Sequence, residues 1–175
     1  MDKCTLVTGG TGYIGSHTTV ALLEAGYQVV IVDNLVNSSD KVLSRIEKIT
    51  GLTPIFVKAD LRDTSTITKV FKEYPITSVV HFAGLKAVKE SVEEPTKYYD
   101  NNLGSALSLV KAMETSGVST LVFSSSATVY SPFEASPVDE GATLSPTNPY
   151  GMTKYFIERM LTDVALGDKD WSIGL

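Results

Sequence analysis

The stretch Gly9-Gly10-Thr11-Gly12-Tyr13-Ile14-Gly15 follows a short apolar run at residues 4–8 and precedes a longer run at residues 13–25. In the pattern G-x-x-G-x-x-G, Gly9 permits a tight turn, Gly12 lets the main chain approach a pyrophosphate, and Gly15 lets the helix pack closely on the sheet. A pyrophosphate would lie at the helix N-terminus, where free N–H groups favour negative charge. Loops collect glycine anyway, but glycines placed between a strand and a helix predict a dinucleotide site.

Short β-branched runs alternate with longer amphipathic runs along the rest of the chain. The short runs are nearly continuously apolar, as expected for parallel strands covered on both faces. Gly26 and Gly51 stand where a helix usually ends, and Pro95 stands where one usually begins. The alternation predicts an α/β fold with a doubly wound parallel sheet, the Rossmann-type dinucleotide-binding fold. We expect strands at residues 4–8, 28–33, 55–59, 78–82 and 120–124, and helices at residues 13–25, 40–50, 63–74, 95–116 and 149–165.

A long irregular stretch at residues 125–148 contains three prolines and leads to the last expected helix. Loops of that length in compact domains are usually functional or disordered. Residues 171–175 resemble the opening of a sixth strand. We therefore expect one dinucleotide-binding domain over residues 1–175, truncated near a sixth strand.

The composition argues against several other kinds of protein. The net charge is −5 and the basic residues are scattered, which argues against nucleic acid or an anionic membrane as the main partner. No apolar stretch approaches the roughly 18 residues that span a bilayer, and the N-terminus lacks a signal-peptide pattern, so we expect a cytoplasmic protein. Cys4 is the only cysteine, which excludes an internal disulfide and a cluster of thiolate metal ligands. We expect Cys4 in the core and no metal site.

An acidic residue ends the second expected strand. Asp33 stands 18 residues after Gly15, where its carboxylate can accept hydrogen bonds from the adenosine ribose and repel the extra phosphate of NADP. The alternative is a helix-capping or turn aspartate. Asp60 ends the third strand in an equivalent place, whereas Asp63 is better explained as a helix cap.

Tyr150 and Lys154 begin the last helix at a spacing of four, which puts both side chains on one face. The fifth strand ends in Ser124-Ser125-Ser126, at the sheet edge where such folds bind ligands. A neighbouring ammonium and the helix N-terminus both favour a phenolate, and a serine hydroxyl can orient a substrate hydroxyl. The alternatives are a packed amphipathic tyrosine and a polar serine turn.

With these residues the sequence resembles the extended short-chain dehydrogenase/reductase family and, within it, the UDP-glucose (UDP-galactose) 4-epimerases. The likeness runs through nearly the whole chain. Two positions depart from the pattern, because Lys89 and Ser131 stand where the family usually has glycine, and both adjoin loops near the site. Besides residues 8–17, Asp33-Asn34-Leu35 with Asn37-Ser38, and Pro149-Tyr150-Gly151 with Lys154, the likeness rests on His81-Phe82-Ala83-Gly84-Leu85-Lys86-Ala87-Val88, Tyr98-Tyr99-Asp100-Asn101-Asn102 and Phe123-Ser124-Ser125-Ser126-Ala127-Thr128-Val129-Tyr130.

The resemblance implies an isomerase of galactose metabolism, which interconverts UDP-glucose and UDP-galactose through a 4-keto intermediate with bound NAD. Tyr150 would take the proton of the sugar 4′-hydroxyl, Ser126 would bond the reacting oxygen, and Lys154 would bind the nicotinamide ribose. Substrate contacts are implied for Lys86, Ser126 and Tyr150. The resemblance also implies a homodimer in the full-length form, and a C-terminal substrate domain that is absent from these 175 residues. The implied cofactor contacts are Gly9, Gly12, Tyr13, Ile14, Gly15, Asp33, Asn34, Asn37, Ser38, Asp60, Leu61, Phe82, Ala83, Gly84, Lys86, Asn101, Ser126, Tyr150 and Lys154.

Three alternatives stay open at this point. A sugar-nucleotide dehydratase of the same superfamily needs an acid where Ser126-Ala127-Thr128 offers no carboxylate. A non-catalytic dinucleotide sensor often loses the tyrosine–lysine pair, which is intact here. The 175 residues by themselves can also be inactive although the whole protein is an enzyme.

Overall fold

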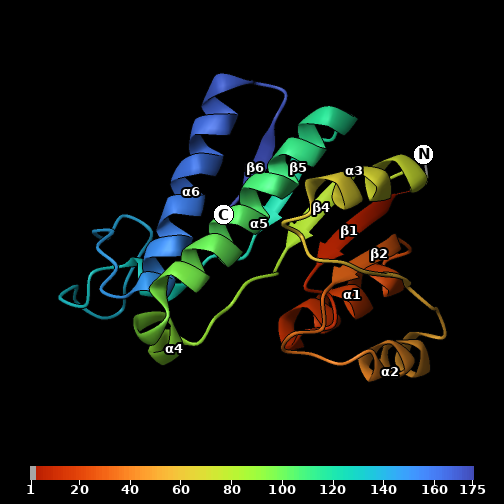
Figure 1. The fold of residues 1–175 in the computed structure, drawn as a ribbon, viewed down its shortest axis with the longest axis horizontal. Coiled ribbons are helices and arrows are strands. Elements are labelled where there is room, and N and C mark those ends of the chain that lie inside the picture. Colours follow the sequence, from red (N-terminus) through yellow and green to blue (C-terminus); the bar gives the residue numbers. More distant parts are fainter. Residues whose placement is uncertain (1–2) are drawn as a thin grey trace.

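Six parallel strands form one sheet, in the order β3-β2-β1-β4-β5-β6, in the computed structural model of the chain (Figure 1). The structure describes residues 3–175. The doubly wound parallel sheet predicted from the sequence is confirmed. The strands are β1 (Cys4–Thr8), β2 (Gln28–Asp33), β3 (Ile55–Lys58), β4 (Ser78–His81), β5 (Thr120–Phe123) and β6 (Ser172–Gly174). The helices are α1 (Tyr13–Glu24), α2 (Lys41–Thr50), α3 (Thr64–Glu73), α4 (Val88–Glu93), α5 (Pro95–Ser116) and α6 (Pro149–Gly167), with a short 3-10 helix η1 (Ala127–Val129).

The sheet separates two apolar cores, and its central strand β1 contributes side chains to both. Leu6 packs with α3, α5 and α6 on one face of the sheet, whereas Val7 packs with α1 and α2 on the other, since successive side chains of a strand point to opposite faces. Figure 1 shows the two groups of helices on the two sides of the sheet. Strand order reverses at β1, because β1 pairs with both β2 and β4. In such sheets the loops that diverge from this point leave a crevice for a ligand.

The two faces of the sheet are not covered equally. In β5, Leu121 and Phe123 are buried, but Val122 between them is 50% exposed. The expectation that all strands are covered on both faces is therefore wrong for β5. The reason is that α1 and α2 pack over β1, β2 and β3, and in residues 3–175 no helix packs over the same face of β5.

Most elements lie within two residues of the bounds expected from the sequence. Gly51 ends α2 in the left-handed conformation, Pro95 begins α5, and the Asp63 side chain caps α3 by accepting from the Thr66 N–H at 3.1 Å. Strands β3, β4 and β5 each end one residue earlier than expected. The six-residue helix α4 was missed, because it is too short to carry a clear apolar period.

The glycine-rich turn is packed too tightly for side chains. Gly9 has φ +68°, and a Cβ on Gly15 would lie 2.3 Å from the carbonyl oxygen of Gly9. A Cβ on Gly10 would lie 2.7 Å from the side chain of Ile31 in β2. The close contact of Gly15 is therefore with the turn itself, whereas Gly10 makes the close approach to the sheet.

We expect Gly15→Ala to destabilise the protein, because the added methyl group meets main-chain atoms that cannot rotate away. Overpacking of this kind costs about 1–3 kcal/mol, more than the alanine gains in helix propensity. The measurement is the free energy of unfolding of the whole protein in urea. The control is Gly167→Ala at the end of α6, where an added Cβ meets nothing within 4 Å. Equal stability of the two variants would contradict this account of the turn.

Candidate functional site

One pocket lies at the carboxyl edge of the sheet, beside the point where strand order reverses. It runs from the β1–α1 turn past the ends of β2, β3 and β4 to the start of α6. All the site residues predicted from the sequence line this pocket except Ser126, which is half-buried and stands outside the lining. The binding roles of these residues stay predictions. The lining also includes residues that sequence reasoning missed, namely Val32, Val36, Ala59, Leu85, Ser105, Ser124 and Ser125.

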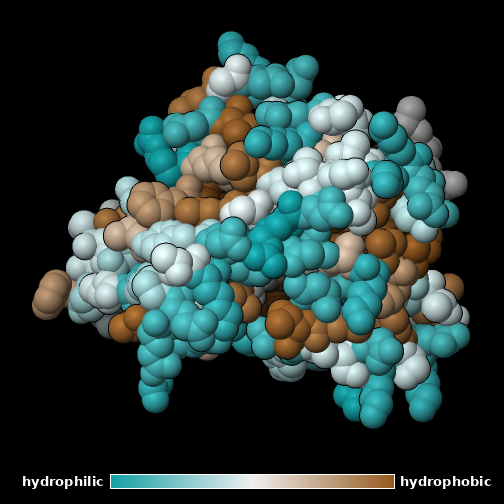
Figure 2. Space-filling view, in the orientation of Figure 1, coloured by the Kyte–Doolittle hydropathy of each residue, from teal (hydrophilic) through white to brown (hydrophobic). Residues whose placement is uncertain are grey.

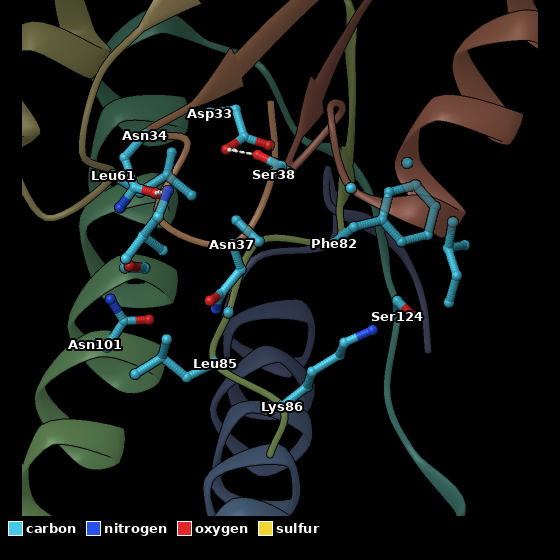
Figure 3. Close-up of a pocket in the computed structure, with 18 of the residues that line it drawn as sticks. Asp33, Asn34, Asn37, Ser38, Leu61, Phe82, Leu85, Lys86, Asn101 and Ser124 are labelled. Carbon is cyan, nitrogen blue, oxygen red and sulfur yellow. Dashed lines mark hydrogen bonds between the residues drawn. The ribbon is translucent and has the colours of Figure 1, made fainter. Parts of the chain in front are cut away.

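Two of the missed residues carried a signal in the sequence. Ser105 follows Asn101 by one helical turn on the same face of α5, so a helix assignment could have found it. Ser124 belongs to the serine run that ends β5. In Figure 3, Asp33 and Ser38 lie at one end of the pocket and Lys86 lies towards the other end, on the loop after β4.

The start of α1 offers an uncapped helix N-terminus to the pocket. Gly12 at the N-cap position makes no side-chain hydrogen bond, and the first turn has no acidic residue. Tyr13 and Ile14 are 77% and 57% exposed although they are large and apolar. Free N–H groups at a helix start are suited to a phosphate or pyrophosphate. The cradle therefore fits the pyrophosphate of a dinucleotide.

Asp33 is held by three hydrogen bonds at the end of β2. Its Oδ1 accepts from the Leu35 N–H at 2.9 Å and from the Ser38 hydroxyl at 3.1 Å, and its Oδ2 accepts from the Thr11 N–H at 3.2 Å (Figure 3). A carboxylate offers about four lone-pair sites, so it keeps capacity for a ribose hydroxyl. Asp33 is thus a turn aspartate, which was the alternative explanation from the sequence, and it also lines the pocket.

A charged cluster surrounds Asp60 after β3. Arg62 donates to both carboxylate oxygens of Asp60, from Nε at 3.0 Å and from Nη2 at 2.7 Å. The same guanidinium pairs with Asp100 on α5. Hydrogen bonds from Arg62 lower the pKa of the Asp60 carboxyl, although burial acts in the opposite direction. Arg62 therefore orients Asp60 in the pocket wall, a role that sequence reasoning missed.

Tyr150 and Lys154 both reach the pocket from the first turns of α6. Asn148 caps this helix by accepting from the Gly151 N–H at 2.8 Å. The Lys154 side chain is buried, and its Nζ donates to the carbonyl oxygen of Ser124 at 2.7 Å. Figure 3 shows Ser124 at the strand end beside the pocket. Tyr150, Lys154 and Ser124 at the end of β5 therefore line the same pocket.

The ammonium of Lys154 lies 4.6 Å above the centre of the Phe123 ring. Burial lowers the pKa of Lys154 to about 8, and Glu158 acts in the opposite direction. The His81 ring stacks on the same Phe123 ring, with the two ring centres 5.6 Å apart. Burial, and then the charge of Lys154, lowers the pKa of His81 to about 3, so the imidazole stays neutral beside the ammonium.

Ser126 faces Thr128 rather than the pocket. Its hydroxyl shares a hydrogen bond of 2.9 Å with the Thr128 hydroxyl and accepts from the Thr128 N–H at 3.2 Å, which caps η1. Ser124 and Ser125 line the pocket instead, and the buried Ser125 hydroxyl has no hydrogen-bond partner among residues 3–175. The structure therefore brings Tyr150 and Lys154 into one pocket, whereas Ser126 does not line it.

The described part of the chain has neither a membrane-spanning helix nor a cluster of metal ligands. No helix in residues 3–175 is long and apolar enough to cross a membrane. Among the same residues, no three or more His, Cys, Asp or Glu side chains are grouped so as to hold a metal ion.

The fold and the pocket place the chain among the Rossmann-type dinucleotide-binding proteins, because a glycine-rich turn and a free helix start meet at the switch point of the sheet. Within that class, the chain belongs to the NAD dependent epimerase/dehydratase family, whose sequence model matches residues 5–170. The resemblance inferred from the sequence is confirmed at this level.

Two curated relatives that the chain resembles are UDP-glucose 4-epimerases. The chain is 54% identical over 170 residues to the UDP-glucose 4-epimerase of Bacillus subtilis, which covers 97% of this chain and 50% of the relative. It is 53% identical over 169 residues to the UDP-glucose 4-epimerase of Neisseria gonorrhoeae, with 96% and 50% covered. The chain thus spans about half the length of the curated relatives it matches.

Solved structures agree with the curated relatives. The UDP-glucose 4-epimerase of Bifidobacterium longum, in complex with NAD+ and UDP, is 48% identical with a TM-score of 0.96. The UDP-glucose 4-epimerase of Stenotrophomonas maltophila, with bound NAD and formylated UDP-arabinopyranose, is 47% identical with a TM-score of 0.95. Each comparison covers 98% of this chain and 51% of the solved chain.

We expect buried Lys154 to give the apoprotein a stability that rises with pH. The folded protein loses this proton near pH 8, whereas the unfolded chain keeps it until about pH 10.5. Because the unfolded state binds more protons between these values, the free energy of unfolding rises across the window, by roughly 3 kcal/mol relative to Lys154→Met.

The measurement is urea unfolding of wild type and Lys154→Met at pH values on either side of this window. Lys111 lies in solvent on α5, and Lys111→Met is the matched control that should show no such difference. A constant difference between wild type and Lys154→Met at all these pH values would contradict the burial of the charge.

Proposed function

We propose that the whole protein is an NAD-dependent UDP-glucose 4-epimerase, which interconverts UDP-glucose and UDP-galactose through a 4-keto intermediate. The observation that carries the proposal is the meeting of Tyr150 and Lys154 with a pyrophosphate-binding turn in one pocket. Identities above 50% to UDP-glucose 4-epimerases across nearly the whole chain support it. A dehydratase is less well supported, because Ser126-Ala127-Thr128 offers no carboxylate to expel a hydroxyl.

The lining residues of the pocket fit NAD as the cofactor. The uncapped start of α1 would hold the pyrophosphate, and Asp33 would accept from the adenosine ribose. Lys154 would bind the nicotinamide ribose. When bound, NAD supplies the redox chemistry, by taking up and returning the hydrogen of the sugar carbon that becomes the ketone.

Tyr150 moves the proton in this proposal. Its phenol stands in the first turn of α6, one helical turn before Lys154, and both side chains line the pocket. The phenolate would accept the proton of the sugar 4′-hydroxyl and return it to the oxygen after the ketone has turned. Ser126 would bind the reacting oxygen with its hydroxyl, which in this structure is hydrogen-bonded to the hydroxyl of Thr128.

The remaining parts of the proposal concern the whole protein. Residues 1–175 would form the NAD-binding domain, and the half that the relatives have in addition would bind the nucleotide sugar. We propose a cytoplasmic homodimer. Exposed apolar side chains on α5 and α6 support the dimer: Leu107 is 45% exposed, and Phe156 is 44% exposed beside the ring of Tyr99. Figure 2 shows apolar patches over α6 on this face of the molecule.

We expect the whole protein to bind NAD at least about tenfold more tightly than NADP, because the carboxylate of Asp33 repels a 2′-phosphate. Titration of both dinucleotides against the apoprotein measures the preference. Asp33→Ser should reduce it, whereas Asp63→Ser, which removes a carboxylate from the cap of α3 outside the pocket, should leave it unchanged. Equal affinities of the wild type for NAD and NADP would overturn the role of Asp33.

We expect Tyr150→Phe to lower turnover in the whole protein by about 10² to 10⁴-fold, since it removes the proton acceptor but keeps the ring. NAD should stay bound, because its phosphates rest on the turn around Gly12. Interconversion of UDP-glucose and UDP-galactose and the content of bound NAD are the two measurements. Tyr155→Phe, on the same helix but outside the pocket lining, is the control. Turnover of Tyr150→Phe within tenfold of wild type would end the proposal for this residue.

A further inference from the structure

Both main-chain groups of Tyr150 are bonded to buried hydroxyl groups. Its N–H donates to the Ser91 hydroxyl at 3.2 Å, and its carbonyl oxygen accepts from the Thr153 hydroxyl at 2.7 Å. Ser91, in α4, is fully buried and donates in turn to the carbonyl oxygen of Val88 at 2.6 Å. The residue that carries the reactive phenol is therefore held through its backbone as well as by the helix to which it belongs.

Thr153 extends this contact to a third element. The Asn102 side chain, from α5, donates from Nδ2 to the Thr153 hydroxyl at 3.0 Å and to the carbonyl oxygen of Leu85 at 3.0 Å. Its Oδ1 accepts from the Leu85 N–H at 2.8 Å. Asn102 is 2% exposed and Thr153 is 0% exposed.

Each hydrogen in this set has a single partner. The two amide hydrogens of Asn102 go to Leu85 and to Thr153, and the hydroxyl hydrogen of Thr153 goes to Tyr150. A hydroxyl that accepts from one side must donate to the other, so the direction of the relay is determined. Because the groups are buried away from water, no alternative partner is at hand when one link is removed.

The two ends of the relay belong to different segments of the pocket wall. Leu85 and its neighbour Lys86 line the pocket from the loop after β4, and Tyr150 lines it from α6. Asn102 and Thr153 therefore connect the Leu85–Lys86 loop to Tyr150, more than sixty residues later in the sequence. Neither Asn102 nor Thr153 lines the pocket itself. Errors of about 1 Å in such placement can cost about 10²-fold in rate.

We infer that Asn102 and Thr153 are positioning residues, which fix the phenol of Tyr150 relative to the Leu85–Lys86 loop through one buried relay. The inference rests on the proposed function, because it assigns the reactive role to Tyr150. It accounts for a polar side chain at each of two buried positions where an apolar residue would fill the same space.

The test is Thr153→Val in the whole protein, which removes the hydroxyl and keeps the shape. We expect kcat per folded molecule to fall about 10- to 100-fold, while KM for UDP-glucose changes less than about threefold. Thr153→Ser keeps the hydroxyl and should restore kcat to within about threefold of wild type. Thr162→Val is the matched control on the same helix: its hydroxyl donates to the carbonyl oxygen of Glu158 at 2.9 Å in an exposed place, and kcat should not change.

A second measurement does not need activity. Hydrogen exchange of the Leu85 amide should speed up about tenfold or more in Thr153→Val, and not in Thr153→Ser or Thr162→Val, because the loss of Thr153 as a partner loosens Asn102. Unchanged exchange at Leu85 would overturn the relay even if the wild type had no epimerase activity. With an active wild type, unchanged kcat in Thr153→Val would overturn the positioning role, whereas an inactive wild type would instead contradict the proposed function.

Discussion

The contact between the start of the first helix and the turn that precedes it is the constraint on which the rest of the site depends. A Cβ on Gly15 would lie 2.3 Å from the carbonyl oxygen of Gly9, so this contact exists only without a side chain. It directs the uncapped N–H groups of α1 to the carboxyl ends of β1 and β4, where strand order reverses. The loops after β2, β3 and β4 then complete a pocket around a helix end that is suited to a pyrophosphate.

The second half of the site depends on a buried charge. Lys154 has its ammonium between the carbonyl oxygen of Ser124 and the ring of Phe123, and burial lowers its pKa to about 8. Keeping such a charge in the core at neutral pH opposes folding, because the ammonium loses its hydration. The Lys154 ammonium therefore lowers the stability of the fold at neutral pH and needs another explanation. The proposed chemistry, in which this charge supports the phenolate of Tyr150, gives a reason for its presence.

Side chains outside the pocket hold Asp60 and Tyr150 in position. Arg62 holds the carboxylate of Asp60 with two hydrogen bonds, and Ser91 and Thr153 hold the backbone of Tyr150 from both sides. Asn102 connects this helix to the loop after β4. A dinucleotide and a sugar must meet at a single geometry for a proton and a hydrogen to leave the same alcohol. In the proposed function, these hydrogen bonds would supply that rigidity.

The sequence by itself determined the sheet, the glycine-rich turn and the residues that could carry chemistry. These features are local: strand and helix periods, the spacing of Gly9, Gly12 and Gly15, and the four-residue separation of Tyr150 and Lys154 are all visible along the chain. Only the tertiary structure decided how those groups are held. It turned the Ser126 hydroxyl to Thr128, left Val122 exposed and joined Asn102 to Thr153. Asn102 and Thr153 lie on different helices, so only the packed structure brings them within hydrogen-bond distance. The exposure of Val122 depends on which helices cover the sheet, and the Ser126 hydroxyl had several possible partners near it in the chain.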